Sequence, residues 1–188
     1  MVSFIANYQL DIMLALAGAT CVTAVYALVT NVISSVRKIV LVALQISTAI
    51  LLLADRVAYI YRGDVSNTGY WMVRISNFLV FFMLIMIIAG VNIYIEDLVM
   101  HEGEAKRVPK RLVFNDIIAL VGAVLVIVTQ FTGFYYTFDS TNHYVRGSGF
   151  LLSYVIPVVI PVIEFDIVGK FLQYNFLNCI SSAFFFSL

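Results

Sequence analysis

Two segments of the sequence combine arginines, carboxylates and aromatic rings, the residue types that bind small anions and aromatic compounds. They cover residues 55–77 and 135–146. Guanidinium groups hold anions through forked hydrogen bonds and contact rings through cation–π interactions. If both segments lie at one end of the molecule, their side chains form a site for a small extracytoplasmic ligand. The residues that we expect to form it are Asp55, Arg56, Arg62, Arg74, Asn77, Tyr136, Asp139 and Arg146.

The same residue types also allow a purely structural interpretation. Tyrosine and tryptophan gather wherever a membrane meets water, whatever the function of the protein. In that interpretation the rings form an interfacial belt, and the arginines pair with Asp55, Asp64 and Asp139 to lock the loops. The sequence leaves both interpretations open.

The elements that position these segments are apolar. The chain is 62% hydrophobic and 12% charged, whereas soluble domains carry about 25% charged residues. Its charges lie in clusters between five apolar runs, each long enough to cross a bilayer with about 20 helical residues. We therefore predict an all-α, polytopic transmembrane helical bundle with five spans and a candidate partial sixth, in contact with the lipid bilayer. The predicted module covers residues 1–170, with spans near 8–30, 39–61, 71–95, 114–136 and 149–169.

The tail, residues 171–188, contains no charged residue. It has three interpretations: a frayed sixth span, an interfacial helix, or the stump of a truncated span. The sequence does not decide among them.

The cations predict the orientation. Seven Lys and Arg residues fall after the first, third and fifth runs, and four Arg residues fall on the opposite side. Cytoplasmic loops collect Lys and Arg. We therefore expect a multi-pass protein of the inner (plasma) membrane with its N-terminus outside.

Ionisable residues are missing from the middle of the predicted spans. Asp11, Asp116, Glu164 and Asp166 fall near the ends of their runs, where we expect water to be within reach. Ion and proton paths generally need ionisable groups at depth. Uncharged polar residues such as Asn92 more often hydrogen-bond between helices. The pattern favours helix packing over transport.

Small residues in the first run predict a close helix contact. Ala15, Ala19 and Thr23 recur at four-residue spacing, which lets transmembrane helices approach closely. A homodimer is one candidate consequence of this stripe.

No sequence motif indicates catalysis. Cys21 and Cys179 form no metal-type spacing, and His101 and His143 are predicted on opposite sides of the membrane. P-loop, nucleophile-elbow and zinc-protease patterns are absent. The basic segment 106–111 fits a solvated cytoplasmic loop better than nucleic-acid binding. We expect no enzyme activity, cofactor, metal or nucleic-acid partner.

The stretch ADRVAYIYRGDVSNTGYWMVRISNFLVFF, residues 54–82, resembles a known membrane module. It is similar to the N-terminal multi-helix part of bacterial signalling proteins whose cytoplasmic GGDEF or EAL domain makes or breaks cyclic di-GMP. Further segments carry the same resemblance: residues 8–18, 129–150 and 153–161.

The resemblance implies a sensory input module that has no catalytic activity of its own. Such modules continue into an output domain, whereas this chain stops at Leu188. Two alternatives therefore stand beside the sensor. One is a small permease-like or accessory membrane subunit, and the other is a nonfunctional truncated fragment that only inserts.

Overall fold

The computed structural model describes the chain apart from residues 1, 31–32, 103–106 and 186–188, and it describes side chains between residues 8 and 173. The described chain is mostly helical, as the sequence predicts. Its elements are α1 (Val2–Val29), α2 (Ser35–Ile60), α3 (Asn67–Glu102), α4 (Lys110–Thr132), β1 (Tyr136–Phe138), β2 (Tyr144–Arg146) and α5 (Leu152–Phe185).

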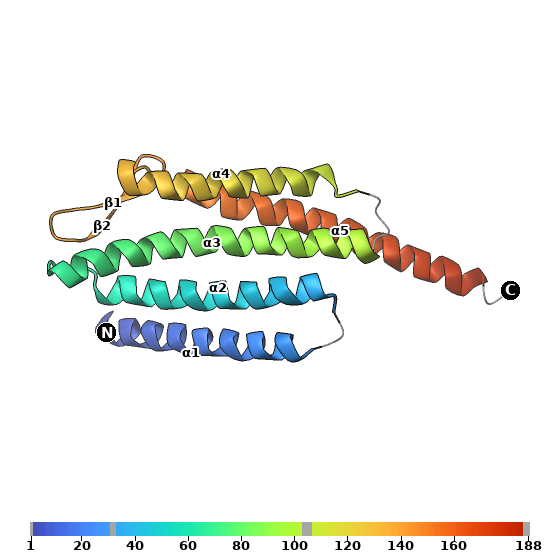
Figure 1. Cartoon of the computed structure of the whole chain (residues 1–188), viewed down its shortest axis with the longest axis horizontal. Helices are drawn as coiled ribbons and strands as arrows, with labels where there is room; N and C mark the ends of the chain where they lie inside the picture. The colour runs from blue at the N-terminus through green and yellow to red at the C-terminus, as the bar shows by residue number, and fades with distance from the viewer. Residues whose placement is uncertain (1, 31–32, 103–106, 186–188) are drawn as a thin grey trace.

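Helix α3 is the centre of the bundle (Figure 1). It packs against α2 on one side and against α4 and α5 on the other, while α1 packs against α2. Strands β1 and β2 lie at the end of the bundle where α2 ends and α3 begins, which we call the hairpin end. The opposite end carries the cations Arg37, Lys38, Lys110 and Arg111, and we call it the basic end.

Four helices are long and apolar enough to cross a membrane: α1 from Tyr8 to Val29, all of α2, all of α3, and all of α4. They contain 22 to 36 residues, whereas a hydrocarbon core of about 30 Å needs about 20. The chain is therefore a membrane protein. Helix α3 also runs past its predicted limits, since it starts four residues earlier and ends seven residues later than the expected span 71–95.

The expectation of five spans and a separate partial sixth needs correction. The four qualifying helices do not include α5, which contains Pro157 and Pro161 and carries Glu164, Asp166 and Lys170. In addition, α5 continues without a break to Phe185, so the described part of the tail is a continuation of this helix. No proline follows Lys170, and the sequence therefore contains no strong helix breaker at the predicted junction.

The chain after α4 is a β-hairpin, which the all-α prediction missed. The predicted fourth span 114–136 is too long, because Gly133 ends α4 with a left-handed φ of 66°. The strands are antiparallel and pair Tyr136 with Arg146 and Phe138 with Tyr144. Aromatic residues at alternate positions favour such strands, but the apolar character of residues 134–136 hides the end of the helix.

The main core lies between α3, α4 and α5 and is closed at the hairpin end by aromatic rings. Ile85, Val126 and Ile160 are buried there together with Tyr135 and Tyr136. Elsewhere the outer helix faces remain apolar and exposed, as at α1 and α4. Such surfaces are suited to contact with lipid.

The face by which α1 packs coincides only in part with the predicted stripe, since the Thr23 hydroxyl donates a 2.9 Å hydrogen bond to the Gln45 side chain of α2. Ala17 and Ala24 are buried, whereas Ala15 and Ala19 are exposed. The two buried residues are seven positions apart, which places them on one helix face two turns apart. The homodimer stays a prediction.

At the basic end, a polar network joins the start of α2 to the end of α3. The Arg37 Nε lies 2.9 Å from Asp97 Oδ2, and the Arg37 guanidinium also pairs with Glu102. Ser34 caps α2 by accepting a hydrogen bond from the Arg37 backbone N–H, and its hydroxyl donates to Asp97. His101 lies beside the same carboxylate, 3.2 Å away.

Candidate functional site

A pocket of about 780 Å³ opens at the hairpin end between α2, α3 and the residues after α4. Its volume falls in the range of about 300–1,000 Å³ that is usual for small-molecule sites. Its lining comprises Asp55, Ala58, Tyr59, Arg62, Val73, Asn77, Val80, Phe81, Tyr144, Val145, Arg146, Phe150 and Tyr154.

Helical spacing explains why these side chains meet. Asp55, Tyr59 and Arg62 follow one another at four and three residues, so they lie on one face of α2 and its terminal turn. Val73 and Asn77 do the same on α3. Asp55 lies about two helical turns further into the bundle than Arg62. The pocket thus has a cationic mouth and a carboxylate at depth.

The mouth of the pocket carries two exposed guanidinium groups, those of Arg62 and Arg146. The Arg146 guanidinium lies 4.7 Å from the ring centre of Phe150. Among the described residues, none of the four hairpin-end arginines forms an ion pair with Asp55 or with the loop carboxylates. The arginine–aspartate locks of the structural interpretation are therefore not formed, and both guanidiniums at the mouth can meet an anion.

A ladder of ring contacts forms one wall of the pocket. Phe81 of α3 stacks on Tyr136 at 5.1 Å, and Tyr136 stacks on Tyr144 at 5.5 Å. The ladder continues by edge contacts from Tyr144 to Phe150 at 6.2 Å and from Phe150 to Tyr154 at 5.0 Å. It therefore links α3, both strands and the start of α5.

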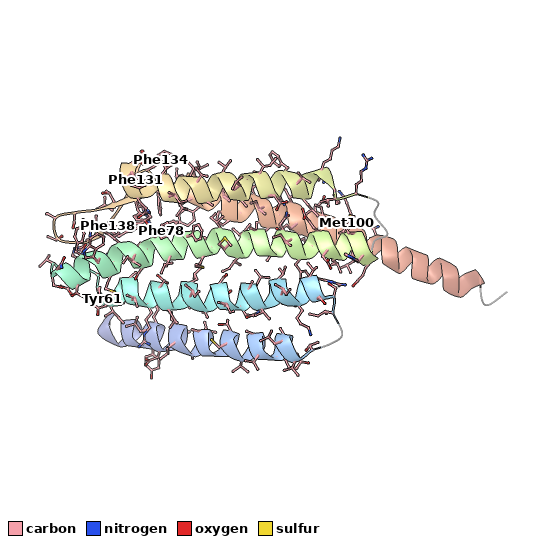
Figure 2. The ribbon with its side chains drawn as sticks, in the orientation of Figure 1. Tyr61, Phe78, Met100, Phe131, Phe134 and Phe138 are labelled. Atoms are coloured by element: carbon pink, nitrogen blue, oxygen red, sulfur yellow. The ribbon has the colours of Figure 1, made fainter. Side chains whose placement is uncertain are left out.

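Aromatic side chains are concentrated at this end of the bundle. Figure 2 shows Phe131, Phe134 and Phe138 there, with Met100 at the opposite end. Burial raises the pKa of Tyr144 to about 12. Its hydroxyl is therefore protonated even at a pH at which an exposed tyrosine ionises.

The structure brings together only part of the predicted site. Four of the predicted residues line the pocket: Asp55, Arg62, Asn77 and Arg146. Arg74 lies between two smaller cavities of about 310 and 180 Å³, of which Tyr136 lines the first and Asp139 the second. Arg56 lines none of the three cavities, and its Nε is buried without a hydrogen-bond partner.

Arg74 fastens the hairpin to α3. Its guanidinium lies 3.5 Å from the ring centre of Tyr70 and 4.8 Å from that of Phe138. It also donates a 2.8 Å hydrogen bond to the Asn142 side-chain oxygen. The Asn142 amide nitrogen in turn donates to the Asp64 carbonyl at 2.8 Å. Arg74 therefore has a structural role beside the pocket.

We expect Asn142→Ala to lower the free energy of unfolding by about 3 kcal/mol. The substitution removes two hydrogen bonds, each worth about 1 kcal/mol, and places alanine at a left-handed φ of 58°. Asn142→Gly loses the same bonds without the backbone strain, and it should be less damaging by about 1 kcal/mol. Unfolding in mixed micelles of increasing SDS content measures both values. If the exposed Ser140→Ala variant loses as much stability, the assigned role of Asn142 is wrong.

Asp139 organises the turn between the strands. Its Oδ1 accepts hydrogen bonds from the backbone N–H of His143 and from the N–H and hydroxyl of Thr141. These bonds lower the pKa of the Asp139 carboxyl group below its usual value, and the bond from the His143 N–H has the largest effect. The turn is therefore most stable with Asp139 ionised.

Acidification should loosen this turn. Because the pKa of Asp139 is lower in the folded than in the unfolded chain, its contribution is present above the unfolded value of 3.8 and is lost as the pH falls through the folded value. We expect faster exchange of the His143 amide hydrogen as the pH falls from about 5 to about 2, beyond the intrinsic pH effect on exchange. Asp139→Asn keeps an acceptor that does not titrate, so its corrected rate should stay flat. Equal profiles would contradict this role.

Comparison with protein-family models, with curated proteins and with solved structures finds no match for this chain.

Three important residues were not among those predicted to bind ligand. Phe150 and Tyr154 line the pocket, and their spacing of four residues at the start of α5 is a usable signal. Asn142 is the buried connector of the hairpin. Nothing in its sequence context distinguishes it from the other polar loop residues.

Proposed function

We propose that this chain is a membrane sensory module that binds a small organic anion with an aromatic or flat apolar part. The observation that carries the proposal is the pocket at the hairpin end. Arg62 and Arg146 supply the positive charge, and Tyr59, Phe81 and Phe150 supply apolar walls. Asp55, deeper in the pocket, accepts a hydrogen bond from an N–H or O–H group of the ligand.

Helix α3 is the element that would carry the signal. It lines the pocket with Asn77 and Phe81 and extends to Glu102, where it is joined to α2. A ligand can shift the bundle only if it binds one packing arrangement more tightly than the other. The ring ladder supplies the contact by which binding changes the positions of α3 and α5.

The wider setting is part of the same proposal. The resemblance of residues 54–82 supports a place at the input end of a bacterial cyclic di-GMP signalling protein, with catalysis carried out elsewhere. The distribution of Lys and Arg supports an inner-membrane location with the N-terminus and the hairpin end outside.

The alternative is a small permease-like or accessory membrane subunit. Buried polar residues at Asn92, Asn115 and Glu164 favour this alternative, because they lie within the bundle. A permease should move a solute across the membrane, whereas a sensor should bind it without flux.

Phenyl phosphate is a suitable probe, since it combines an anion with a ring. We expect saturable binding to the full chain in nanodiscs by calorimetry, weakened about tenfold or more by Arg62→Ala or Arg146→Ala, because hydrogen bonds to charged groups contribute about 1.5–3 kcal/mol. Arg111→Ala removes the same charge at the basic end and should leave the affinity unchanged. Equal affinities in all four proteins, or no saturable binding, would contradict the proposed site.

Two further readouts separate sensing from transport. Spin labels at the exposed positions Val36 and Leu172, on α2 and α5 near the basic end, should change their separation when phenyl phosphate binds. In proteoliposomes, labelled phenyl phosphate should not accumulate. Accumulation that Arg146→Ala abolishes would favour the permease.

A further inference from the structure

A second polar site lies inside the bundle, between α3, α4 and α5 and closer to the basic end. Asn92, Asn115 and Glu164 are 1%, 0% and 5% exposed, respectively. Glu96 and Asp116 lie beside them and are half-buried. The expectation that water reaches Glu164 is therefore wrong. We call these five residues the acid–amide cluster.

The donors of the acid–amide cluster are the two asparagine amides. The Asn92 amide nitrogen donates to the Leu112 carbonyl at 3.0 Å and to Asp116 Oδ1 at 2.7 Å. The Asn115 amide nitrogen donates to Asn92 Oδ1 at 3.3 Å. In these hydrogen bonds both amide nitrogens donate, and the Asp116 carboxylate accepts.

The cluster has more acceptors than donors. The carboxyl groups of Glu96 and Asp116 lie against each other. Two ionised carboxylates have only acceptors, so they can form a hydrogen bond with each other only if they share one proton. In addition, Asn115 Oδ1 and Glu164 Oε1 are buried without any hydrogen-bond partner. Buried polar atoms are normally satisfied, and the two unsatisfied acceptors therefore point to a missing proton donor.

Among the described residues, no cation forms an ion pair with a carboxylate of the cluster. Arg111 and Lys170 both pair with Asp166 on the outside of the bundle. Arg37 pairs with Asp97 and Glu102, and His101 also lies beside Asp97. The three carboxyl groups of the cluster come from three helices: Glu96 from α3, Asp116 from α4 and Glu164 from α5.

Across the part of the chain that the structure describes, no three His, Cys, Asp or Glu side chains are arranged to hold a metal ion. A proton needs only one or two oxygen atoms, and it removes the charge that is costly to bury.

We propose that the acid–amide cluster is a proton-binding site, in which Glu96 and Asp116 share one proton and Glu164 binds a second. The protons come from water and add to carboxylate oxygens, so no bond other than O–H forms or breaks. The site is separate from the ligand pocket, and it does not depend on the proposed sensory function. Proton release would place negative charge between three packed helices and weaken their contact.

Infrared difference spectroscopy of the full chain in nanodiscs tests this proposal. We expect the C=O stretch of protonated carboxyl groups at about pH 6, with loss of that stretch by about pH 9. Labelling with ¹³C-carboxyl glutamate should shift the stretch, which tests the assignment in the unmodified protein. No such stretch, or a stretch that the label leaves unmoved, would overturn the proposal.

Variants assign the two protons. Glu164→Gln and Glu96→Gln replace a protonated acid by a neutral amide of similar shape, and each should remove about half of the signal. Asp11→Asn, at an exposed position of α1, should leave the signal unchanged. If both glutamine variants retain the full signal, the protons lie elsewhere and the proposal fails.

Discussion

Replacing Arg37 by alanine is expected to lower the free energy of unfolding by about 3 kcal/mol. The Arg37 side chain is 11% exposed and that of Asp97 is 7% exposed. Removing the guanidinium leaves the Asp97 carboxylate buried without its ion-pair partner, and that desolvation dominates the cost. The expected value is at the lower end of the range for buried pairs, because the network lies at the end of the bundle, where some water reaches it. SDS unfolding of the chain in mixed micelles measures the change.

Arg111→Ala is the matched control for this prediction. Arg111 pairs with Asp166, but their side chains are 64% and 45% exposed. Exposed pairs contribute at most about 1 kcal/mol. Arg37→Lys keeps the charge but not the fork of donors, and should fall between the two. Equal losses in Arg37→Ala and Arg111→Ala would show that the network at the start of α2 has no special role.

Gly147→Ala is expected to displace strand β2 and abolish the ligand pocket. An added Cβ would collide with the carbonyl oxygens of Gly133 and Phe134. These are backbone atoms, which cannot turn aside as the end of a flexible side chain can. The hairpin must therefore move. We expect a loss of at least about 3 kcal/mol, the upper range for overpacking, together with loss of phenyl phosphate binding.

Two other glycines provide a graded comparison. At Gly149 an added Cβ would meet the Phe134 ring, a side chain that can shift, so the loss should be smaller. At Gly18 the Cβ would meet nothing within 4 Å, and Gly18→Ala should be neutral or slightly stabilising because alanine favours the helix. If Gly147→Ala binds phenyl phosphate as the unmodified chain does, the close approach at β2 does not maintain the pocket.

The sequence predicted the helices well because the signal for a membrane span is local. About 20 apolar residues in a row satisfy their backbone groups internally only as a helix. Four of the predicted spans correspond to helices that qualify as spans. The sequence indicates their ends less well, because charges such as Glu96 and Asp97 are typical of the limit of a span. In the folded chain both residues stay in α3 and find polar partners.

The site was predicted only in part, because a local sequence signal shows at which end of the bundle a residue lies but not where its side chain points. Arg62 and Arg146 could be assigned to one end of the bundle from the alternation of apolar runs and loops. Their convergence on one pocket depends on the rotation of α2 and on the path of the hairpin. Arg74 has the same residue type, but it points to Tyr70 and Asn142 and fastens the hairpin instead. Residue type does not distinguish these two roles.

The sequence by itself determined that this chain forms apolar helices with a cationic, aromatic end, because hydrophobic length and charge are properties of single segments. Only the tertiary structure decided which polar groups meet. It placed Arg62 and Arg146 at the mouth of one pocket, and it buried Glu164, Asn92 and Asn115 inside the bundle. Such contacts depend on helix rotation and on neighbours far apart in the chain, and a one-residue rotation of a helix turns a side chain by about 100°.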